Sequence, residues 1–175
     1  VDAANEASKK REEEQASSNN ESKKDDKKAS KEDLEEILKL QYIAYQSEAK
    51  LLGNNEIPPL KQTIDEVNKE YQKGVILKVV NNFKIIGSVR MYEDCGTVYI
   101  GKLMVHPDYQ RHGLGAKLLL EVEKYFPNKR YELFTSTLSK SNIAFYEKNG
   151  YRCFKQEAVN DTLSFVYMEK FEGED

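Results

Sequence analysis

Two glycines, Gly113 and Gly115, are the most constraining feature of this 175-residue chain, because they lie where a predicted strand passes into a predicted helix. The strand covers residues 97–105 and ends at His106-Pro107, since proline cannot donate a hydrogen bond to a neighbouring strand. The helix covers residues 113–126 and has an apolar stripe at helical spacing, so we expect it to pack against a sheet. The stripe consists of Leu114, Leu118, Val122 and Tyr125.

The start of this helix suits a phosphate or pyrophosphate group. Glycine lets the backbone approach a ligand closely, and the first N–H groups of a helix have no partner within it. The helix dipole adds a partial positive charge at the same end, and Arg111 and His112 add hydrogen-bond donors. The segment is neither a Walker loop, which requires Gly-Lys-Ser/Thr, nor a dinucleotide fingerprint, which requires a third glycine.

The remaining periodicity predicts a mixed α/β fold, with a mostly antiparallel sheet and helices on both faces. The first helix begins near Leu34 and ends at Gly53, and Asn81-Asn82 joins the first two strands as a hairpin. Gly150 is expected to end the last helix in a left-handed conformation. The other predicted helices cover residues 60–72 and 141–149, and the other strands cover residues 75–80, 83–92, 131–137, 151–156 and 163–171.

Residues 1–29 form a polar, charged segment that we expect to lie outside the core, as a disordered tail or as a solvated helix. Before Leu34 the only apolar side chain larger than alanine is Val1, so the segment cannot bury enough surface to offset its ordering entropy. Ser30 followed by Asp33 resembles a capping box, which marks the start of the domain predicted over residues 30–175. The tail also leaves open a tethered interaction protein.

Composition argues against several classes of function. The formal net charge of −3, without a dense Lys/Arg face, gives no reason to expect nucleic acid as a partner. Cys95 and Cys153 are far apart and fit no metal or redox spacing, which indicates free, reduced thiols and no metal site. No apolar run approaches the ~20 residues of a membrane span, and none marks a signal peptide. We therefore expect a cytoplasmic protein without a membrane partner.

A second group of candidate residues lies on the helix predicted for residues 141–149. Asn142 stands at its start and has an amide that can both donate and accept hydrogen bonds. Tyr146 follows one turn later on the same face. On the sequence alone, Tyr146 is also explained as an aromatic side chain that packs in a half-buried position.

With both groups in this order, the sequence resembles the GNAT acetyltransferase superfamily over residues 30 to 170. The segment from Gln110 to Gly115 matches the family's Gln/Arg-x-x-Gly-x-Gly/Ala pyrophosphate loop, and Leu103 to Pro107 matches the strand that precedes it. The matching residues of the later helix are Asn142, Ala144, Phe145, Tyr146 and Gly150. The resemblance implies a GNAT fold, with acetyl-CoA as the cosubstrate and no metal.

The resemblance also implies which residues bind acetyl-CoA. The backbone of Leu103, Met104 and Val105 is expected to pair with the pantetheine arm as an added strand would. Asn142 is expected to contact the same arm, and Tyr146 to lie near the thioester sulfur as the acid that protonates the departing thiolate. The pyrophosphate is assigned to the loop and the first helical turn, which consist of Gln110, Arg111, His112, Gly113, Leu114, Gly115 and Ala116.

The general base is the least defined part of the predicted site. Some family members use a carboxylate on the third strand, but the corresponding position here is Tyr99, and no acidic residue lies between Gly96 and Val105. An acid elsewhere would have to remove the proton from the amine. The alternatives are, in order, Glu48 on the first helix near the expected cleft, then Glu56 and Glu93, with a water chain to a distant acid equally open.

The N-terminal part departs from the family pattern as well. Family members begin with a short apolar strand where this chain has the charged residues 23–28. That strand is therefore expected to be absent, polar or replaced. Because it lies at a sheet edge, its loss does not break the fold.

Together these inferences predict an acetyl-CoA-dependent N-acetyltransferase that acts directly on a primary amine of a small molecule or peptide. The alternative is a GNAT-like module that binds acyl-CoA and regulates without catalysis, which the missing strand carboxylate favours. The sequence does not identify the amine, and it leaves a homodimer open. The segment that lines the acceptor cleft in the family corresponds here to Tyr42, Tyr45, Ile57, Pro58 and Pro59.

Overall fold

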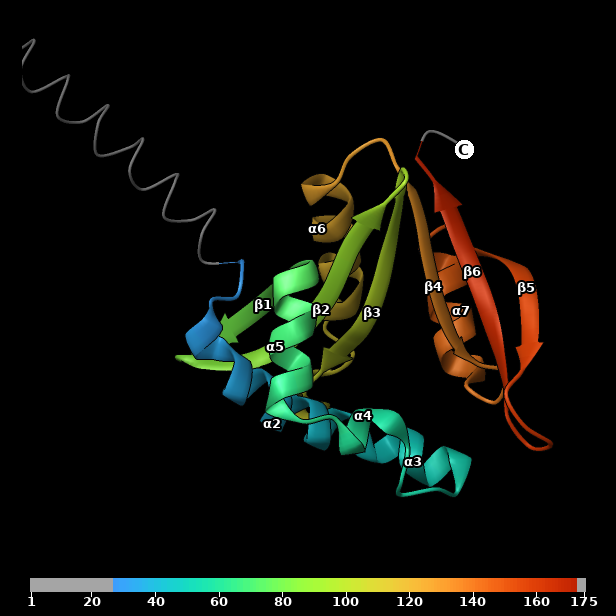
Figure 1. The fold of residues 1–175 in the computed structure, drawn as a ribbon, viewed down its shortest axis with the longest axis horizontal. Coiled ribbons are helices and arrows are strands. Elements are labelled where there is room, and N and C mark those ends of the chain that lie inside the picture. Colours follow the sequence, from blue (N-terminus) through green and yellow to red (C-terminus); the bar gives the residue numbers. More distant parts are fainter. Residues whose placement is uncertain (1–26, 173–175) are drawn as a thin grey trace, which may run out of the picture.

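The computed structural model describes residues 27–172, which form one sheet with helices packed on it (Figure 1). The strands are β1 (Val75–Asn81), β2 (Lys84–Asp94), β3 (Thr97–Val105), β4 (Arg130–Ser136), β5 (Arg152–Ala158) and β6 (Ser164–Phe171). The helices are α2 (Leu34–Ala44), α3 (Gln46–Leu52), α4 (Pro58–Lys61), α5 (Ile64–Lys73), α6 (Leu114–Tyr125) and α7 (Lys140–Lys148), with 3-10 turns at Lys31–Asp33 and Pro107–Tyr109.

The strands lie in the order β1-β2-β3-β4-β6-β5. Every neighbouring pair is antiparallel except β3 and β4, which run parallel. The predicted mixed, mostly antiparallel sheet is thereby confirmed. The parallel pair follows from the order of the elements, because the crossover helix α6 returns the chain to the end of the sheet from which β3 started.

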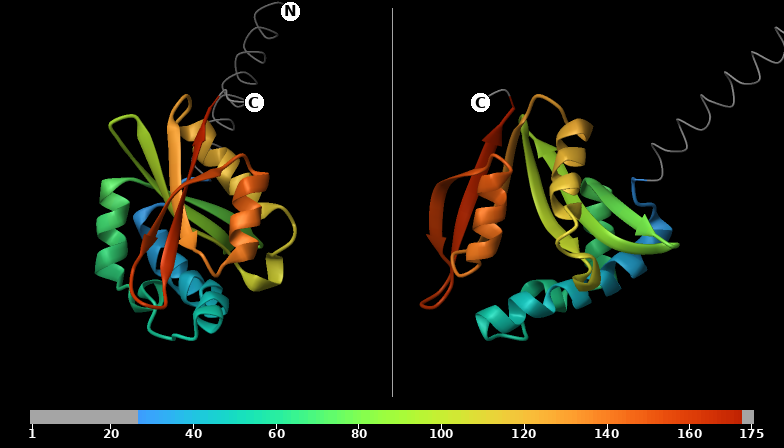
Figure 2. Two further views of the ribbon diagram at one scale, coloured as in Figure 1. Left: turned by 90° about the vertical axis from the view of Figure 1, so that its right-hand side faces the viewer. Right: turned by 180° about the vertical axis from the view of Figure 1, so that it is seen from behind.

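Helices cover both faces of the first half of the sheet, as predicted (Figures 1 and 2). On one face, α2 and α5 pack on β1 and β2 through a cluster that includes Ile37, Val67 and Ile76. On the other face, α6 packs on the sheet through Leu118 and Val122. Helix α7 lies along β4 and β6, behind them in the view of Figure 1. None of the helices in residues 27–172 is long and apolar enough to cross a lipid bilayer.

Strand β2 is buried over a continuous run from Ile85 to Met91, because helices cover both of its faces. Such a run contains no polar-apolar alternation, so its polar members need partners inside the protein. Ser88 finds one across the hairpin, where its hydroxyl donates to the Leu77 carbonyl oxygen at 2.8 Å.

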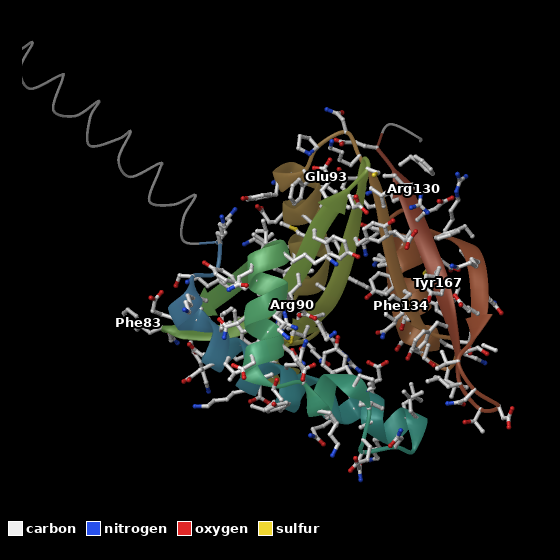
Figure 3. All side chains as sticks on the ribbon, in the orientation of Figure 1. Phe83, Arg90, Glu93, Arg130, Phe134 and Tyr167 are labelled. Atoms are coloured by element: carbon white, nitrogen blue, oxygen red, sulfur yellow. The ribbon has the colours of Figure 1, made fainter. Side chains whose placement is uncertain are left out.

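Arg90, on the α5 side of β2, is only 5% exposed and joins three elements (Figure 3). Its guanidinium donates to Gln41 Oε1 at 2.7 Å and to Gln62 Oε1 at 2.9 Å. It also forms an ion pair with Glu70 at 2.6 Å. These contacts tie β2 to α2, to α5 and to the connection between α4 and α5. Moving any of these elements away would leave the buried Arg90 charge without a partner, which is strongly destabilising. The network therefore fixes these elements relative to β2.

The prediction of a single helix over residues 60–72 is wrong, because the structure contains two helices there, α4 and α5. Helix α4 ends at Lys61, Gln62 has an extended backbone, and α5 begins after Thr63. The Thr63 hydroxyl caps α5 by accepting a hydrogen bond from the Glu66 amide at 3.3 Å. The cap starts a new helix, and the bonds of the Gln62 side chain in the Arg90 network hold the break in place.

The turn predicted at Asn81-Asn82 lies one residue later, at Asn82 and Phe83, which have φ angles of 49° and 62°. A two-residue hairpin turn of this type needs left-handed backbone at both central positions. Phe83 therefore lies in the turn rather than in the strand, and its side chain projects fully exposed from the hairpin tip (Figure 3).

The single helix predicted from Leu34 to Gly53 is divided at Tyr45, whose backbone is not helical, into α2 and α3. The predicted ends at Gly53 and Gly150 are confirmed, with φ angles of 62° and 92°.

At the N-terminal edge of the sheet, where a first strand was expected to be absent, polar or replaced, the described residues contain one β bridge, between Lys28 and Leu77. The Ala29 amide donates to the Ile76 carbonyl at 2.8 Å, and Ala29 is 2% exposed. The packed domain therefore begins before the boundary expected at residue 30, and Ala29 belongs to the core rather than to the tail. Residues 1–26 of the predicted tail lie outside the described residues.

Asp33 holds this N-terminal segment against the sheet. Its Oδ2 accepts a hydrogen bond from the Ser30 amide at 2.8 Å, which confirms the predicted capping interaction. The same oxygen pairs with Lys78 of β1 at 2.8 Å. Partial burial opposes ionisation, but the hydrogen bonds from Lys78 and Ser30 outweigh it and lower the pKa of Asp33 below its ordinary value.

We predict that Asp33→Asn lowers the free energy of unfolding by about 1–2 kcal/mol near neutral pH, because it removes a charged acceptor. Because the folded-state pKa is lowered, this stability is present above the unfolded value of about 3.9 and is lost as the pH falls through the folded value. Urea unfolding over this pH range measures the difference. Glu32→Gln, at an exposed position of the same turn, is the control, and an equal loss in both variants contradicts the prediction.

Candidate functional site

A cavity opens where β3 and β4 separate. The two strands pair only over Thr97–Tyr99 and Arg130–Glu132, and both continue beyond this joint without pairing to each other. They spread apart towards their C-terminal ends (Figure 1). Between them lies a cavity of about 610 Å³.

The walls of the cavity come from both halves of the sheet and from the helices around it. Strand β3 contributes residues 100–105 and β4 contributes residues 133–136. Many of the residues predicted from the sequence are among those that line it. These are Glu48, Leu103, Met104, Val105, Gln110, Asn142 and Tyr146.

Strand β3 presents an unpaired edge to this cavity. Gly101, Met104 and Val105 pair with β2 on one side. Their other side, towards β4, has no strand partner in residues 27–172. An extended molecule can add to such an edge through backbone hydrogen bonds. Leu103, Met104 and Val105, predicted for the pantetheine arm, lie along it.

The same strand bulges at Lys102. Ser88 of β2 pairs with Met104 while Arg90 pairs with Gly101, so β3 has one residue more than β2 over this interval. Lys102 has a φ of 50°, a left-handed conformation that costs a residue with a side chain about 1–2 kcal/mol. Bulges of this kind change the direction of side chains near active sites. The alternation of strand residues did not indicate the bulge, and Lys102 was not predicted as a site residue.

The glycine junction follows directly after β3. The Gln110 side-chain amide donates to the Val105 carbonyl at 3.3 Å. Arg111 and Gly113 have φ angles of 67° and 76°, so the loop turns sharply before α6 begins at Leu114. Gly113 has no side chain that could cap the helix, which leaves its first amides for another acceptor. The predicted residues outside the cavity lining are Arg111, His112, Gly113, Leu114, Gly115 and Ala116, which form this loop and the first turn of α6.

Helix α7 brings Asn142 and Tyr146 to the opposite wall. Asn142 Nδ2 donates to Thr135 Oγ1 at 3.4 Å, which links α7 to β4. Helix α7 also approaches α6 closely, because a Cβ added to Gly115 would lie 3.1 Å from the Phe145 ring. The second glycine of the junction therefore serves the contact between the two helices.

The two predicted catalytic side chains have shifted ionisation. Burial, with a smaller contribution from Glu48, raises the pKa of Tyr146, so its phenol stays protonated. Burial also raises the pKa of Glu48, and the charge of Lys102 opposes this shift. A carboxylate with a raised pKa is a better proton acceptor near neutral pH. Both residues line the cavity, where Tyr146 can donate a proton and Glu48 can accept one.

The other candidate bases are not part of the cavity lining. Glu56 is exposed and pairs with Lys61 at 2.7 Å. Glu93 lies at the far end of β2 from α3 and α4 (Figure 3). Tyr99, the position of the strand carboxylate in some family members, belongs to the part of β3 that pairs with β4. None of these three residues lines the cavity.

All but one of the residues expected to line the acceptor cleft are in the cavity lining. Tyr45, Ile57 and Pro58-Pro59 line the cavity. Tyr42 does not, and its hydroxyl donates instead to the Gln62 carbonyl oxygen. Tyr42 therefore helps to position the link between α4 and α5 rather than to form the wall.

Ser139 is a site residue that sequence reasoning missed. It is 2% exposed, lines the cavity, and its hydroxyl has no hydrogen-bond partner among the described residues. Leaving a buried polar group unpaired costs about 1–3 kcal/mol, so a polar ligand atom would be favoured there. The one signal in the sequence is a serine before a helix, which capping explains equally well.

Among residues 27–172, no group of three or more His, Cys, Asp or Glu side chains could hold a metal ion.

The sequence is similar to known proteins. A family model described as an acetyltransferase (GNAT) domain matches residues 46–171. The UPF0157 protein YqkA of Bacillus subtilis is 27% identical over 125 residues, which are 71% of this chain and 35% of that protein. The chain therefore spans about a third of the length of this curated relative.

Solved structures share the fold. The PaiA N-acetyltransferase from Thermoplasma acidophilum, in complex with coenzyme A, has a TM-score of 0.67 at 19% identity, with 82% of this chain and 95% of that chain covered. The ribosomal-protein-S18-alanine N-acetyltransferase from Escherichia coli has a TM-score of 0.67 at 17% identity, with 85% and 93% covered.

We predict that Gly115→Leu lowers the free energy of unfolding by about 1–3 kcal/mol, because the added side chain would force α6 away from Phe145. Urea unfolding measures the loss. Gly101→Leu is the control, since a Cβ at Gly101 meets nothing within 4 Å. Equal stability of the two variants would show that α7 moves freely to accept the larger residue.

Proposed function

This chain belongs to the GNAT acetyltransferase family, and we propose that it transfers an acetyl group from acetyl-CoA directly to a primary amine of an acceptor. The observation that carries the proposal is one cavity that contains the unpaired edge of β3, the start of α7, and the candidate acid and base. Such an arrangement can place a thioester between a proton donor and an amine.

The residues around the cavity fit acetyl-CoA. The pantetheine arm has amide groups, which the free edge of β3 at Leu103 to Val105 can pair with as a strand would. Asn142 and the unpartnered Ser139 hydroxyl offer further polar contacts to the same arm. The turn from Gln110 to Ala116 presents free helix amides, which suit a pyrophosphate.

Acetyl-CoA supplies a thioester, whose carbonyl carbon accepts the amine nitrogen and whose sulfur departs as a thiolate. The amine reacts only when neutral, whereas a free alkyl amine has a pKa of about 10.4. We assign Glu48 to remove its proton, directly or through a water molecule, because it is the acidic residue in the cavity lining. A β3 amide near Met104 would stabilise negative charge on the thioester oxygen.

We assign Tyr146 to protonate the departing thiolate. Burial keeps its phenol in the protonated form, so the proton is available. The raised pKa also makes the phenol a weaker acid, so transfer depends on the negative charge that develops on the sulfur. Direct transfer of this kind needs no covalent enzyme intermediate, and the two cysteines, Cys95 and Cys153, are exposed and outside the cavity lining.

The test is to mix the full chain with acetyl-CoA and a panel of primary amines and to follow the release of free thiol. Acetyl-CoA binding with turnover of at least one amine supports the proposal. Binding without turnover of any amine would favour the alternative of a non-catalytic acyl-CoA sensor. A protein that does not bind acetyl-CoA at all would contradict both readings.

We predict that Gly113→Glu abolishes acetyl-CoA binding, because it places a negative charge where the pyrophosphate is expected. A Cβ added at Gly113 meets no atom within 4 Å, so the fold should persist despite the φ of 76°. Calorimetric titration measures the affinity. Gly96→Glu is a matched control, with a φ of 82° and equally open surroundings in the β2–β3 turn. Loss of binding in both variants would indicate backbone strain rather than charge.

We predict that Tyr146→Phe lowers kcat by about a hundredfold or more while the dissociation constant of acetyl-CoA changes little, because the variant loses only the proton donor. Steady-state thiol release and a binding titration measure the two quantities. Tyr125→Phe, at an exposed position of α6, should leave both unchanged. An unchanged kcat in Tyr146→Phe would show that water protonates the thiolate.

A further inference from the structure

We infer that the acceptor carries a carboxylate close to its amine, and that the Lys102 ammonium binds this carboxylate inside the cavity. The acceptor would then be a small molecule of the amino-acid type, whose ammonium group lies at Glu48. This inference rests on the proposed function, since it specifies the class of amine that the same site would acetylate.

Lys102 lies at the β3 bulge and in the lining of the cavity. In a regular strand, the Lys102 side chain would point to the face of the sheet opposite to that of Gly101 and Leu103. The extra residue in β3 breaks this alternation, and both Gly101 and Lys102 line the cavity with Leu103. A non-glycine residue held at a φ of 50° is the kind of backbone strain that clusters at functional sites.

The Lys102 ammonium is surrounded by charges without pairing to any of them. Glu70, Arg90 and Glu48 act on it electrostatically, but within residues 27–172 it forms no ion pair or hydrogen bond. Glu70 is already paired with Arg90 at 2.6 Å. Burial lowers the pKa of Lys102, and the two glutamates oppose this shift. A partly buried cation without a partner favours an anionic ligand.

The charges around the cavity suit an acceptor with two opposite charges. Lys102 and Glu48 are the only Lys, Arg, Asp or Glu side chains among the described residues that line it. A molecule with both an ammonium and a carboxylate can satisfy each of them. An acceptor with a second cationic group in place of the carboxylate would instead meet repulsion from Lys102.

The rest of the acceptor wall indicates the kind of side chain that accompanies these charges. Leu51, Leu52 and Ile57 line it from α3 and the segment before α4. Phe134 and Phe165 line it from β4 and β6, with ring centroids 4.9 Å apart. Such surroundings favour a branched aliphatic or aromatic group, because its burial removes apolar surface from water.

Three amines that differ at one position test the inference. Leucine has the carboxylate, leucinamide replaces it with a neutral amide, and 3-methylbutylamine lacks it. We expect kcat/KM for leucine to exceed that for leucinamide by about tenfold or more, because the carboxylate makes a charge-assisted contact. The amine of leucinamide is less basic and so more often neutral, which means that amine reactivity cannot account for a preference for leucine.

Variants of Lys102 connect the preference to this residue. Lys102→Met should bring the ratio of kcat/KM for leucine to leucinamide close to one, and Lys102→Arg should retain part of it. The ratio does not change when a variant merely loses folded or active protein. Lys50→Met, at an exposed position of α3 outside the cavity lining, is the control and should keep the wild-type ratio. Glu48→Gln should lower kcat/KM for all three amines.

The outcomes separate this inference from the proposed function. A preference for leucine that disappears in Lys102→Met and persists in Lys50→Met supports it. Equal use of leucine and leucinamide, a preference that survives Lys102→Met, or turnover restricted to amines without a carboxylate would overturn it while leaving acetyl transfer in place. Failure to turn over any amine would overturn the proposed function, and the inference with it.

Discussion

The short parallel pairing of β3 with β4 is the interaction on which the rest of the site depends. It covers Thr97 to Tyr99 on one strand and Arg130 to Glu132 on the other, and then it stops. A continuous pairing would have used the β3 edge from residue 100 onwards in hydrogen bonds to β4. The separation instead leaves that edge available and opens a cavity of about 610 Å³ within the sheet. One sheet thus provides both the scaffold and the free strand edge that a cosubstrate of the pantetheine type can use.

Packing on the two faces positions the groups around this opening. On one face, the buried contacts of Arg90 fix α2 and α5 to β2, and α3, which carries Glu48, continues directly from α2. On the other face, Gly115 lets α7 approach α6 through Phe145, which sets the position of Tyr146 one residue later. The candidate base and the candidate acid therefore come from opposite halves of the fold. Their distance depends on the β3–β4 joint rather than on a direct contact between them.

The sequence predicted the features that depend on local patterns. Alternation and helical spacing, with Pro107 as a stop, were enough for the strands, for α6 and for the mixed sheet. The glycine junction and the later helix with Asn142 and Tyr146 together led to the correct family. Features set by distant contacts were missed. The break at Gln62 depends on Arg90, and the bulge at Lys102 depends on its register with β2. Turn geometry rather than β propensity put Phe83 outside its strand. The roles of the site residues, the cytoplasmic location and the homodimer stay predictions.

The β3–β4 joint also has a mechanical consequence. Three residue pairs connect two sheet halves that are otherwise held together by side-chain packing, so backbone hydrogen bonds resist their separation less here than between other neighbouring strands. A molecule that fills the cavity contacts β3 on one side and β4 on the other, and so connects the two halves of the sheet. Binding to the folded state always adds stability. In this fold that stability opposes one particular motion, the separation of the unit formed by β4, β6, β5 and α7 from β3. The bound ligand thereby helps to hold the two halves of the sheet together.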